Sequence, residues 1–252
     1  MARRKYVQIE NKNALLELLR EGRKFQRIFV AHNAFKDPKT KEILDEAHKA
    51  DVPINKVARR DLDRRSRTAA RESVIGLMLP QNQWNLDDLL EKLYSKKEDP
   101  FFLIFDHVRY SLNIGAIMRT AFGGFVNGVI THIKKASFLT DEALRISMGA
   151  CERIPVVEMN LFSAIKELQD NAIKVIGLET GGEPYFNVDL TGPVAIVLGA
   201  EDVGISPRVL ERVDEVATIP MREGIGSLNV NASASIMIYE KVRQEAVAMG
   251  NS

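Results

Sequence analysis

The stretch VAIVLGAEDVGIS, residues 194–206, joins a continuous apolar run to a glycine-rich turn. An uninterrupted apolar run predicts a strand covered on both faces, since a strand with one exposed face alternates apolar and polar residues. Gly199 and Gly204 bracket the turn, where a backbone without Cβ atoms approaches a ligand closely. Ligands of open α/β sheets bind beyond the carboxyl ends of strands, so the turn is a candidate site. Glu201 within it is either a site acid or an ordinary loop carboxylate.

The pattern around this strand is an alternation of strands and helices, which predicts parallel pairing. Strands are expected at 101–105, 127–133, 154–158, 173–179, 194–199 and 214–219, and helices at 113–124, 140–149, 161–170, 206–213 and 229–246. A smaller α/β module precedes them, with strands at 25–31, 52–58 and 72–80 and helices at 13–22 and 39–50. The fold class is therefore α/β with two domains. We expect them at 1–80 and 101–252, joined by a polar linker at 81–100 that carries one short helix.

The charge of the chain is unevenly distributed. Residues 1–80 hold 19 Lys and Arg against 11 Asp and Glu, whereas residues 81–252 hold 16 against 23. The densest basic patch is KVARRDLDRRSRTAARE, residues 56–72, with seven basic and three acidic residues. Such a run is either a solvated helix with internal ion pairs or a surface for a polyanion. The asymmetry of the whole segment favours nucleic acid.

Composition excludes several classes of protein. No apolar run approaches the roughly 20 residues of a membrane helix, and the first residues lack the apolar core of a signal peptide. The single cysteine, Cys151, excludes an internal disulfide and a cysteine-based zinc site, and it fits a reducing cytoplasm. The four histidines, at 32, 48, 107 and 132, show no metal-ligand spacing, so no metal is expected. No G-x-G-x-x-G follows strand 101–105, which disfavours a Rossmann-type dehydrogenase or methyltransferase.

A second candidate site follows the strand at 101–105. Asn113 stands where a helix is expected to begin, which predicts an N-cap, and Gly115 keeps the first turn narrow. Arg119 is alone on an otherwise apolar helix. It either binds an anion or extends its head group to solvent from the helix surface.

The third candidate is IPMREGIGSLNVNASAS, residues 219–235. Pro220 ends the strand, Met221 to Gly226 form a loop, and Ser227, Leu228 and Asn229 lead into the last helix. The small residues that follow let two backbones approach closely, either for helix packing alone or around a ligand.

Together the three segments resemble the SpoU branch of the trefoil-knot (SPOUT) RNA ribose 2'-O-methyltransferases. The first family motif, N-x-G-x-x-x-R-[ST]-A, matches Asn113, Gly115, Arg119, Thr120 and Ala121. The second, L-G-x-E-x-x-G, matches Leu198, Gly199, Glu201 and Gly204. The third, I-P-M followed by S-L-N-V, matches Ile219, Pro220, Met221, Ser227, Leu228, Asn229 and Val230. The resemblance spans about residues 100–246, and Asp202-Val203 and Ser111-Leu112 depart from it.

The resemblance implies a trefoil-knotted C-terminal domain that binds S-adenosyl-L-methionine, and a basic N-terminal RNA-binding domain with an L30e-like fold. The cofactor contacts it implies are Leu198, Gly199, Ile219, Met221 and Leu228. The catalytic residues it implies are Asn113, Arg119, Glu201, Ser227 and Asn229, with Arg119 as the catalytic arginine. It also implies a homodimer with the active site at the subunit interface.

The expected reaction is 2'-O-methylation of a ribose in structured RNA, with 23S ribosomal RNA as the favoured substrate. A transfer-RNA enzyme of the same family, a role in antibiotic resistance, and a non-catalytic RNA-binding or ribosome-assembly protein remain open. The target nucleotide, its base and the subunit that supplies Arg119 to each cofactor are not determined by the sequence.

Overall fold

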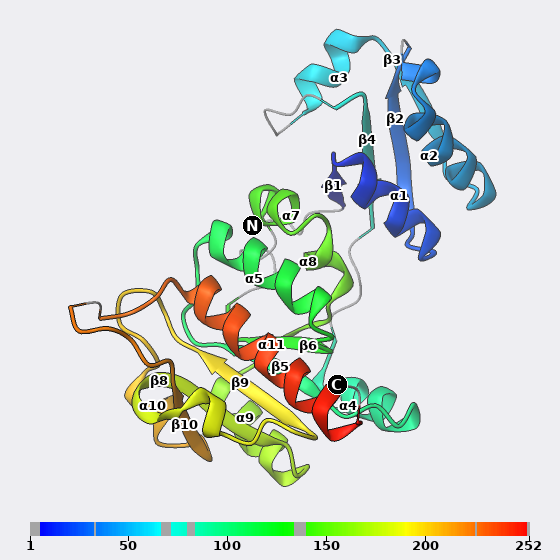
Figure 1. The fold of residues 1–252 in the computed structure, drawn as a ribbon. Helices are drawn as coiled ribbons and strands as arrows, with labels where there is room; N and C mark the ends of the chain where they lie inside the picture. The colour runs from blue at the N-terminus through cyan, green and yellow to red at the C-terminus, as the bar shows by residue number, and fades with distance from the viewer. Residues whose placement is uncertain are drawn as a thin grey trace.

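The N-terminal part of the chain folds around a four-stranded mixed sheet (Figure 1). The computed structural model describes residues 6–32, 34–66, 72–79, 84–133, 140–224 and 226–250. The strand order is β1-β4-β2-β3, in which β2 and β3 are parallel and β4 runs antiparallel to both β1 and β2. The elements are β1 (Val7–Ile9), α1 (Lys12–Arg20), β2 (Phe25–Ala31), the 3-10 turn η1 (Ala34–Lys36), α2 (Pro38–Lys49), β3 (Ile54–Val57), α3 (Arg59–Arg65) and β4 (Val74–Met78).

Local sequence accounts for these elements. The Asn11 side chain accepts a hydrogen bond from the Ala14 backbone N–H and begins α1, and Gly22 follows its end with a φ of 73°. Four leucines at helical spacing turn one face of α1 into the core, Leu15, Leu16, Leu18 and Leu19. Helix α3 is the described part of the basic patch, because residues 67–71 lie outside the described residues. Strand β1 was not expected from the sequence.

The C-terminal part contains a six-stranded parallel sheet in the order β10-β8-β9-β5-β6-β7. The parallel pairing expected from the strand–helix alternation is confirmed. Its strands are β5 (Phe101–Phe105), β6 (Gly128–Thr131), β7 (Val156–Glu158), β8 (Lys174–Pro184), β9 (Val194–Leu198) and β10 (Glu215–Thr218). Its helices are α4 (Leu86–Ser95), α5 (Ser111–Gly123), α7 (Asp141–Ile146), α8 (Ala150–Arg153), α9 (Leu161–Asp170), the 3-10 turn η2 (Tyr185–Asn187), α10 (Pro207–Leu210) and α11 (Val230–Ala248).

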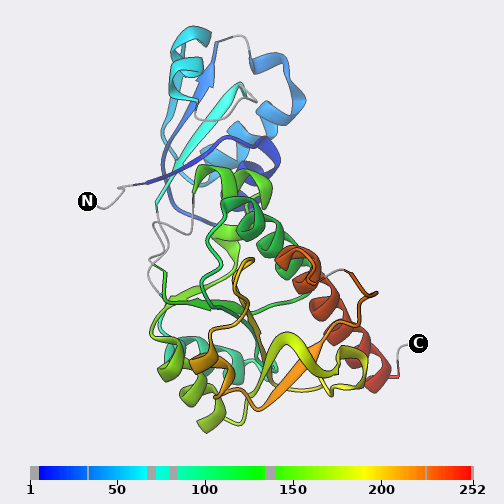
Figure 2. The same ribbon diagram turned by 90° about the vertical axis from the view of Figure 1, so that its left-hand side faces the viewer.

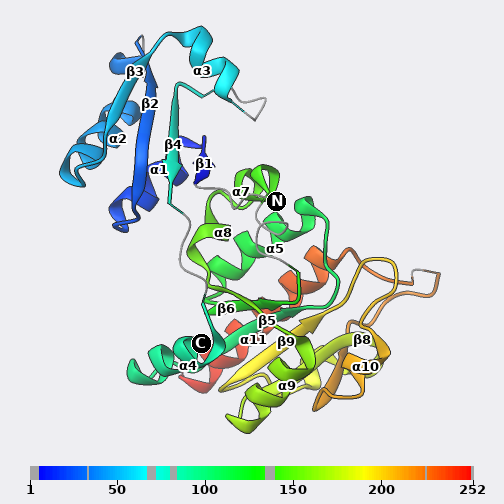
Figure 3. The same ribbon diagram turned by 180° about the vertical axis from the view of Figure 1, so that it is seen from behind.

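Helices cover both faces of this sheet, which explains the uninterrupted apolar strands (Figures 1 and 3). Along β5 the side chains alternate between two cores. Phe101, Leu103 and Phe105 belong to a core shared with α5 and α11. Phe102 and Ile104 belong to the opposite core, shared with α4 and α9. Both cores are buried, so the central strands are held from two sides.

Helix α4 belongs to this second core. Its four leucines are buried together with residues of β5 and α9, Leu86, Leu89, Leu90 and Leu93. The segment expected as a polar linker is therefore docked on the sheet from residue 86 onward, while residues 80–83 lie outside the described residues. No helix in the described part of the chain is long and apolar enough to cross a membrane.

The two sheets are joined by contacts between α1 and α8, and the N-terminal unit stands above the C-terminal one in Figure 2. The Arg23 guanidinium forms an ion pair with the buried carboxylate of Glu152, with 3.3 Å between Nη2 and Oε2. Burial lowers the pKa of Arg23, and the charge of Glu152 opposes this shift. Arg153 pairs with both Glu17 and Glu21 of the N-terminal unit. These ion pairs connect the N-terminal unit to α8 of the C-terminal unit.

Three sequence predictions about helices need correction. Asn113 is not the N-cap of α5, because the helix begins at Ser111 after Tyr110 and encloses Asn113 in its first turn. The helix expected at 140–149 is split into α7 and α8, with Gly149 at a φ of 88° between them. The helix expected at 206–213 is shorter, since α10 spans only Pro207–Leu210.

Candidate active site

Residues of β8, the loop after β9 and the segment between β10 and α11 line a cavity of about 300 Å³. These three segments meet there although they come from distant parts of the C-terminal sequence. The lining includes all five residues expected to contact the cofactor, Leu198, Gly199, Ile219, Met221 and Leu228. It also includes two of the expected catalytic residues, Glu201 and Ser227. Ile225, in the last of these loops, lies outside the described residues.

The turn after β9 needs glycine at both of its ends. Ala200 and Gly204 exchange two backbone hydrogen bonds of 3.0 Å, which closes the turn. A Cβ atom on Gly199 would lie 2.1 Å from the carbonyl carbon of Gly204, closer than side-chain atoms approach a backbone. Gly204 has a φ of 67°, in the left-handed region that glycine adopts without strain. Both glycines are therefore required by the close packing of the turn itself, which lines the cavity.

Two carboxylates accept hydrogen bonds from the backbone at the end of this turn. One is on β8 and the other follows β5, the two strands that pair with β9. The Glu179 Oε2 atom accepts a hydrogen bond from the Ile205 N–H at 2.9 Å. The Asp106 Oδ2 atom accepts one from the Ser206 N–H at 2.7 Å. Asp106 is 1% exposed and Glu179 is half-buried. Neither residue was expected from the sequence, although each is an acidic residue directly after an apolar run, which was the available signal.

Asn113 connects the three motifs. Its side-chain amide donates a hydrogen bond to Glu201 Oε1 at 2.5 Å, and its carbonyl oxygen accepts one from Asn229 Nδ2 at 3.1 Å. Asn229 also begins α11, because its side-chain oxygen accepts a hydrogen bond from the Asn231 N–H at 2.9 Å. The structure thus brings together Asn113, Glu201 and Asn229, which are far apart in the sequence. The cap of the last helix is asparagine, and Ser227 lies in the loop before it.

Arg119 lies apart from this network. Six residues of helix separate it from Asn113, which corresponds to about 9 Å along α5 and a rotation of roughly 120°. Its side chain is exposed, and among the described residues it forms no hydrogen bond or ion pair. The apolar neighbours on α5 are buried in the core, so Arg119 is a surface cation with its guanidinium available to an anion.

The last helix packs on α5 beside Arg119, which explains the small residues after Asn229. Ala234 is fully buried, and Ser235 Oγ lies 3.4 Å from Thr120 Oγ1. A Cβ atom on Gly124 would lie 2.1 Å from Ile238 Cγ2. The small residues of the two helices therefore allow α5 and α11 to approach closely. This close packing places Asn229, at the start of α11, beside Asn113.

The cavity is acidic. Its lining contains the three carboxylates of Glu179, Glu201 and Asp202, and no lysine or arginine is among the described residues that line it. Opposite charges attract most strongly where water is partly excluded, so this lining favours a cationic ligand over a neutral one of the same shape.

Histidines that are distant in the sequence also come together nearby. The rings of His107 and His132 have centroids 4.4 Å apart, and the His107 Nδ1 atom lies 2.6 Å from Asp106 Oδ1. Burial, followed by the charge of His107, lowers the pKa of His132. The sequence spacing of the histidines did not predict this proximity.

Comparison with protein families matches both parts of the chain. Residues 100–239 match the SpoU rRNA Methylase family, and residues 9–81 match the domain described as RNA 2'-O ribose methyltransferase substrate binding. The protein RlmB of Haemophilus ducreyi, named a 23S rRNA (guanosine-2'-O-)-methyltransferase, is 34% identical over 83% of this chain and 86% of its own length. YacO of Bacillus subtilis, whose name places it in the TrmH family of tRNA/rRNA methyltransferases, is 32% identical over 92% and 94%.

Solved structures share the fold. The SpoU methyltransferase AviRb from Streptomyces viridochromogenes, in complex with AdoMet, has a TM-score of 0.81 at 20% identity and covers 97% of this chain and 92% of its own. An AdoMet-bound rRNA methyltransferase from Sinorhizobium meliloti has a TM-score of 0.78 at 21% identity, with 95% and 87% covered. The sheet order and the three converging loops are therefore set in a known architecture.

Proposed function

Because this chain belongs to the SpoU rRNA methylase family of RNA 2'-O ribose methyltransferases, we propose that it transfers a methyl group from S-adenosyl-L-methionine to a ribose of 23S ribosomal RNA. The observation that carries the proposal is the network of Asn113, Glu201 and Asn229 at the edge of an acidic cavity. The N-terminal unit, with its exposed arginines on α3, would hold the RNA. A reduced, buried Cys151 is consistent with a reaction in the cytoplasm.

The residues of the cavity fit S-adenosyl-L-methionine. The glycine turn exposes backbone N–H and C=O groups that adenine and ribose can bind, and the carboxylates suit a sulfonium cation. Leu198, Ile219, Met221 and Leu228 supply apolar surface for the adenine ring. When bound, the sulfonium supplies an activated methyl group, so the protein need not activate the leaving group.

The remaining task of the protein is to place the ribose hydroxyl and to assist the loss of its proton. We infer that Arg119 binds a phosphate of the target nucleotide and stabilises the negative charge that develops on the 2'-oxygen. Arg119 does not act as a base, since a neutral guanidine is energetically remote. The ribose and the surrounding loops would be positioned by four residues, Asn113, Glu201, Ser227 and Asn229.

A test of substrate class compares RNA from a deletion strain with RNA from its parent. We expect one 2'-O-methyl group to be absent from 23S ribosomal RNA and to return when purified enzyme and S-adenosyl-L-methionine are added. A missing methyl group in transfer RNA instead would favour the transfer-RNA alternative. A protein that binds RNA without binding S-adenosyl-L-methionine in calorimetry would be the non-catalytic alternative.

A homodimer is part of the proposal, because Arg119 is exposed and does not line the cavity of its own subunit. Exposed apolar side chains lie near it on α5 and α11, including Leu112 at 58% exposure and Tyr239 at 54%. Light scattering during gel filtration should give twice the 28.3 kDa mass of the chain. Leu112→Arg should shift the protein toward monomer, and a monomeric wild type would contradict the dimer.

The carboxylate of Glu179 has a predicted role in cofactor binding. In Glu179→Ala the Ile205 N–H loses its acceptor and the cavity loses a negative charge, so the Kd for S-adenosyl-L-methionine should rise by about 10- to 100-fold. Glu179→Gln keeps an acceptor oxygen, so its Kd should lie between the values of wild type and Glu179→Ala. Its affinity for S-adenosylhomocysteine, which lacks the sulfonium charge, should fall less than its affinity for the cationic donor. Calorimetry measures both ligands.

Glu183 provides the matched control, because it is an exposed glutamate on the same strand and does not line the cavity. Glu183→Ala should bind the cofactor like wild type. An unchanged Kd in Glu179→Ala would show that the turn holds its shape without this carboxylate.

Arginines on α3 have a predicted role in RNA binding. Arg60 and Arg64 are exposed. Replacing both with alanine should reduce the magnitude of the slope of log affinity against log salt concentration by roughly 1 to 2. Fluorescence anisotropy with a labelled RNA fragment measures this slope. The control removes Lys41 and Lys49 of α2, which lies on another side of the N-terminal sheet (Figures 1 and 3). Equal changes in both double variants would mean that RNA does not engage α3 specifically.

A further inference from the structure

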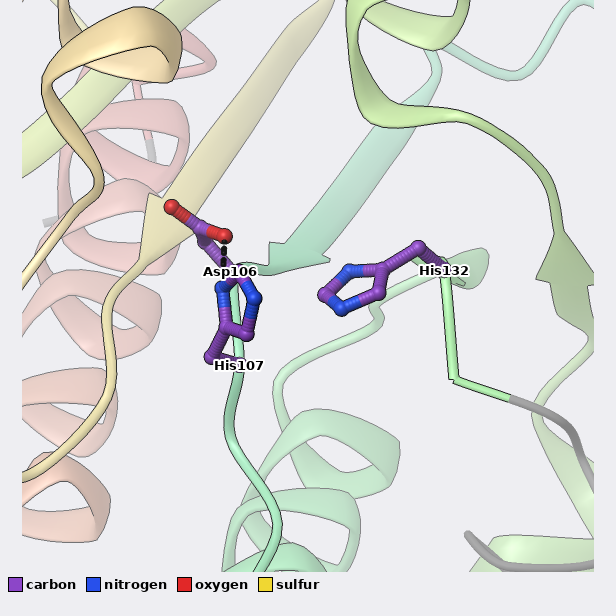
Figure 4. A group of neighbouring side chains, drawn as sticks. All are labelled: Asp106, His107 and His132. Carbon is purple, nitrogen blue, oxygen red and sulfur yellow. Dashed lines mark hydrogen bonds and ion pairs between the residues drawn. The ribbon is translucent and has the colours of Figure 1, made fainter.

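The ends of two neighbouring strands carry a cluster of one aspartate and two histidines (Figure 4). Asp106 and His107 directly follow β5, and His132 follows β6. These strands are parallel neighbours, with Phe105 opposite Thr131, so the residues after them are held side by side. One ligand atom from each of the three residues lies within 4.8 Å of the other two.

Asp106 fixes the orientation of His107. Its Oδ2 atom accepts from the Ser206 N–H, and its Oδ1 atom lies 2.6 Å from His107 Nδ1. A buried carboxylate in this position makes Nδ1 the protonated nitrogen, which leaves the lone pair on Nε2. A carboxylate behind a histidine is the arrangement that orients metal-binding imidazoles in proteins.

The backbone of His107 is also constrained. Its φ is 63°, in the left-handed region that few non-glycine residues occupy. The hydrogen bond of Asp106 to the turn before α10 holds this part of the chain in place. In Figure 4 the His107 ring extends toward His132, whose ring faces it from the end of β6.

We propose that His107 Nε2 and one ring nitrogen of His132 bind a divalent transition metal ion such as Zn²⁺, with Asp106 as the carboxylate that orients His107. Zinc–nitrogen bonds of about 2.0–2.1 Å require the two nitrogens to be roughly 3.3 Å apart. His132 is exposed, and we expect its ring to turn toward His107 when the metal binds. Water would complete the coordination, because both histidines reach the surface. The expectation of no metal, drawn from the spacing of the histidines, is replaced by this proposal.

This site is separate from the cavity, since none of its three residues is in the cavity lining. It would tie the end of β5, where the chain turns toward α5 and Asn113, to the end of β6. The proposed metal is not a participant in methyl transfer, so the two proposals are tested independently.

The experiment titrates ZnCl₂ into the tag-free, chelator-treated full chain in a calorimeter, and follows Co²⁺ binding by its visible absorption. We expect one metal equivalent per chain in wild type. We expect metal binding to weaken at least about 10-fold in His107→Gly and in His132→Ala, and glycine at position 107 also suits the positive φ. Asp106→Asn should weaken binding as well, because it removes the carboxylate that orients His107. Melting temperatures of the variants without metal check that they fold.

The matched controls are His32→Ala and His48→Ala, which remove exposed histidines of the N-terminal unit and should bind metal like wild type. Absence of metal binding by wild type overturns the proposal. Binding that survives in the combined His107→Gly and His132→Ala variant also overturns it, because the metal then lies elsewhere, for example on the carboxylates of the cavity.

Discussion

Replacing Arg119 with alanine will lower methyl transfer by at least about 1,000-fold and leave the Kd for S-adenosyl-L-methionine within a few-fold of wild type. The physical reason is its position. Arg119 is exposed on α5, forms no ion pair among the described residues and is not part of the cavity lining. Its removal therefore leaves the cavity intact but takes away the cation proposed to bind the nucleotide phosphate. Transfer of tritium from labelled cofactor to RNA measures the loss, and calorimetry measures cofactor binding.

Two further variants sharpen this result. Arg119→Lys retains the charge but not the planar pair of donors, so its activity should recover only in part. Arg20→Ala removes an arginine that is half exposed and pairs with Glu42 on the N-terminal surface, and it should leave activity unchanged. Methyl transfer near the wild-type rate in Arg119→Ala would refute the assigned role.

The second large effect is expected for Gly199→Ala. The added Cβ atom would lie 2.1 Å from the Gly204 carbonyl carbon and 2.3 Å from the Ile205 nitrogen, and both are backbone atoms that cannot rotate away. The turn must open, which breaks the hydrogen bonds that Ala200 and Glu179 make within it. A cost of about 3 kcal/mol corresponds to a Kd for S-adenosyl-L-methionine at least roughly 100-fold higher.

Gly226 supplies the matched control for this prediction. It also lines the cavity, but a Cβ atom there would meet nothing within 4 Å, and Gly226→Ala should bind cofactor within a few-fold of wild type. Calorimetry on both variants, with melting temperatures to confirm folding, separates the steric effect from general sensitivity of the loops. Wild-type affinity in Gly199→Ala would mean that the turn is not a part of the cofactor site.

The candidate site was predictable where it depends on backbone geometry. Glycines at 199 and 204 indicated close approach to a ligand, and the structure shows that a Cβ atom at either position would collide with its surroundings. Asn113 was identified for the wrong local reason. Its spacing suggested an N-cap, yet its amide hydrogen-bonds to Glu201 and Asn229. The pairing of β5 with β9 brings Glu201 within reach, and the packing of α5 against α11 brings Asn229.

Other residues could not be identified from the sequence. Glu179 and Asp106 look like ordinary acidic residues at strand ends until β8, β9 and β5 pair and bring both carboxylates to one turn. His107 and His132 are 25 positions apart in the sequence, and their proximity follows from the pairing of β5 with β6. Such contacts depend on strand order, which hydrophobic periodicity does not encode.

The sequence by itself determined the α/β class, the two-part organisation, the parallel pairing of the C-terminal strands and the positions of the three motifs. These depend on local periodicity, glycine and apolar runs, which act over a few residues. Only the tertiary structure decided which motifs touch, that α4 belongs to the second core and that Arg119 lies outside the lining of the cavity. The reason is that the order and direction in which whole elements pack determine which distant residues touch. That order and direction depend on how the entire domain buries its apolar surface, which no short stretch of sequence specifies.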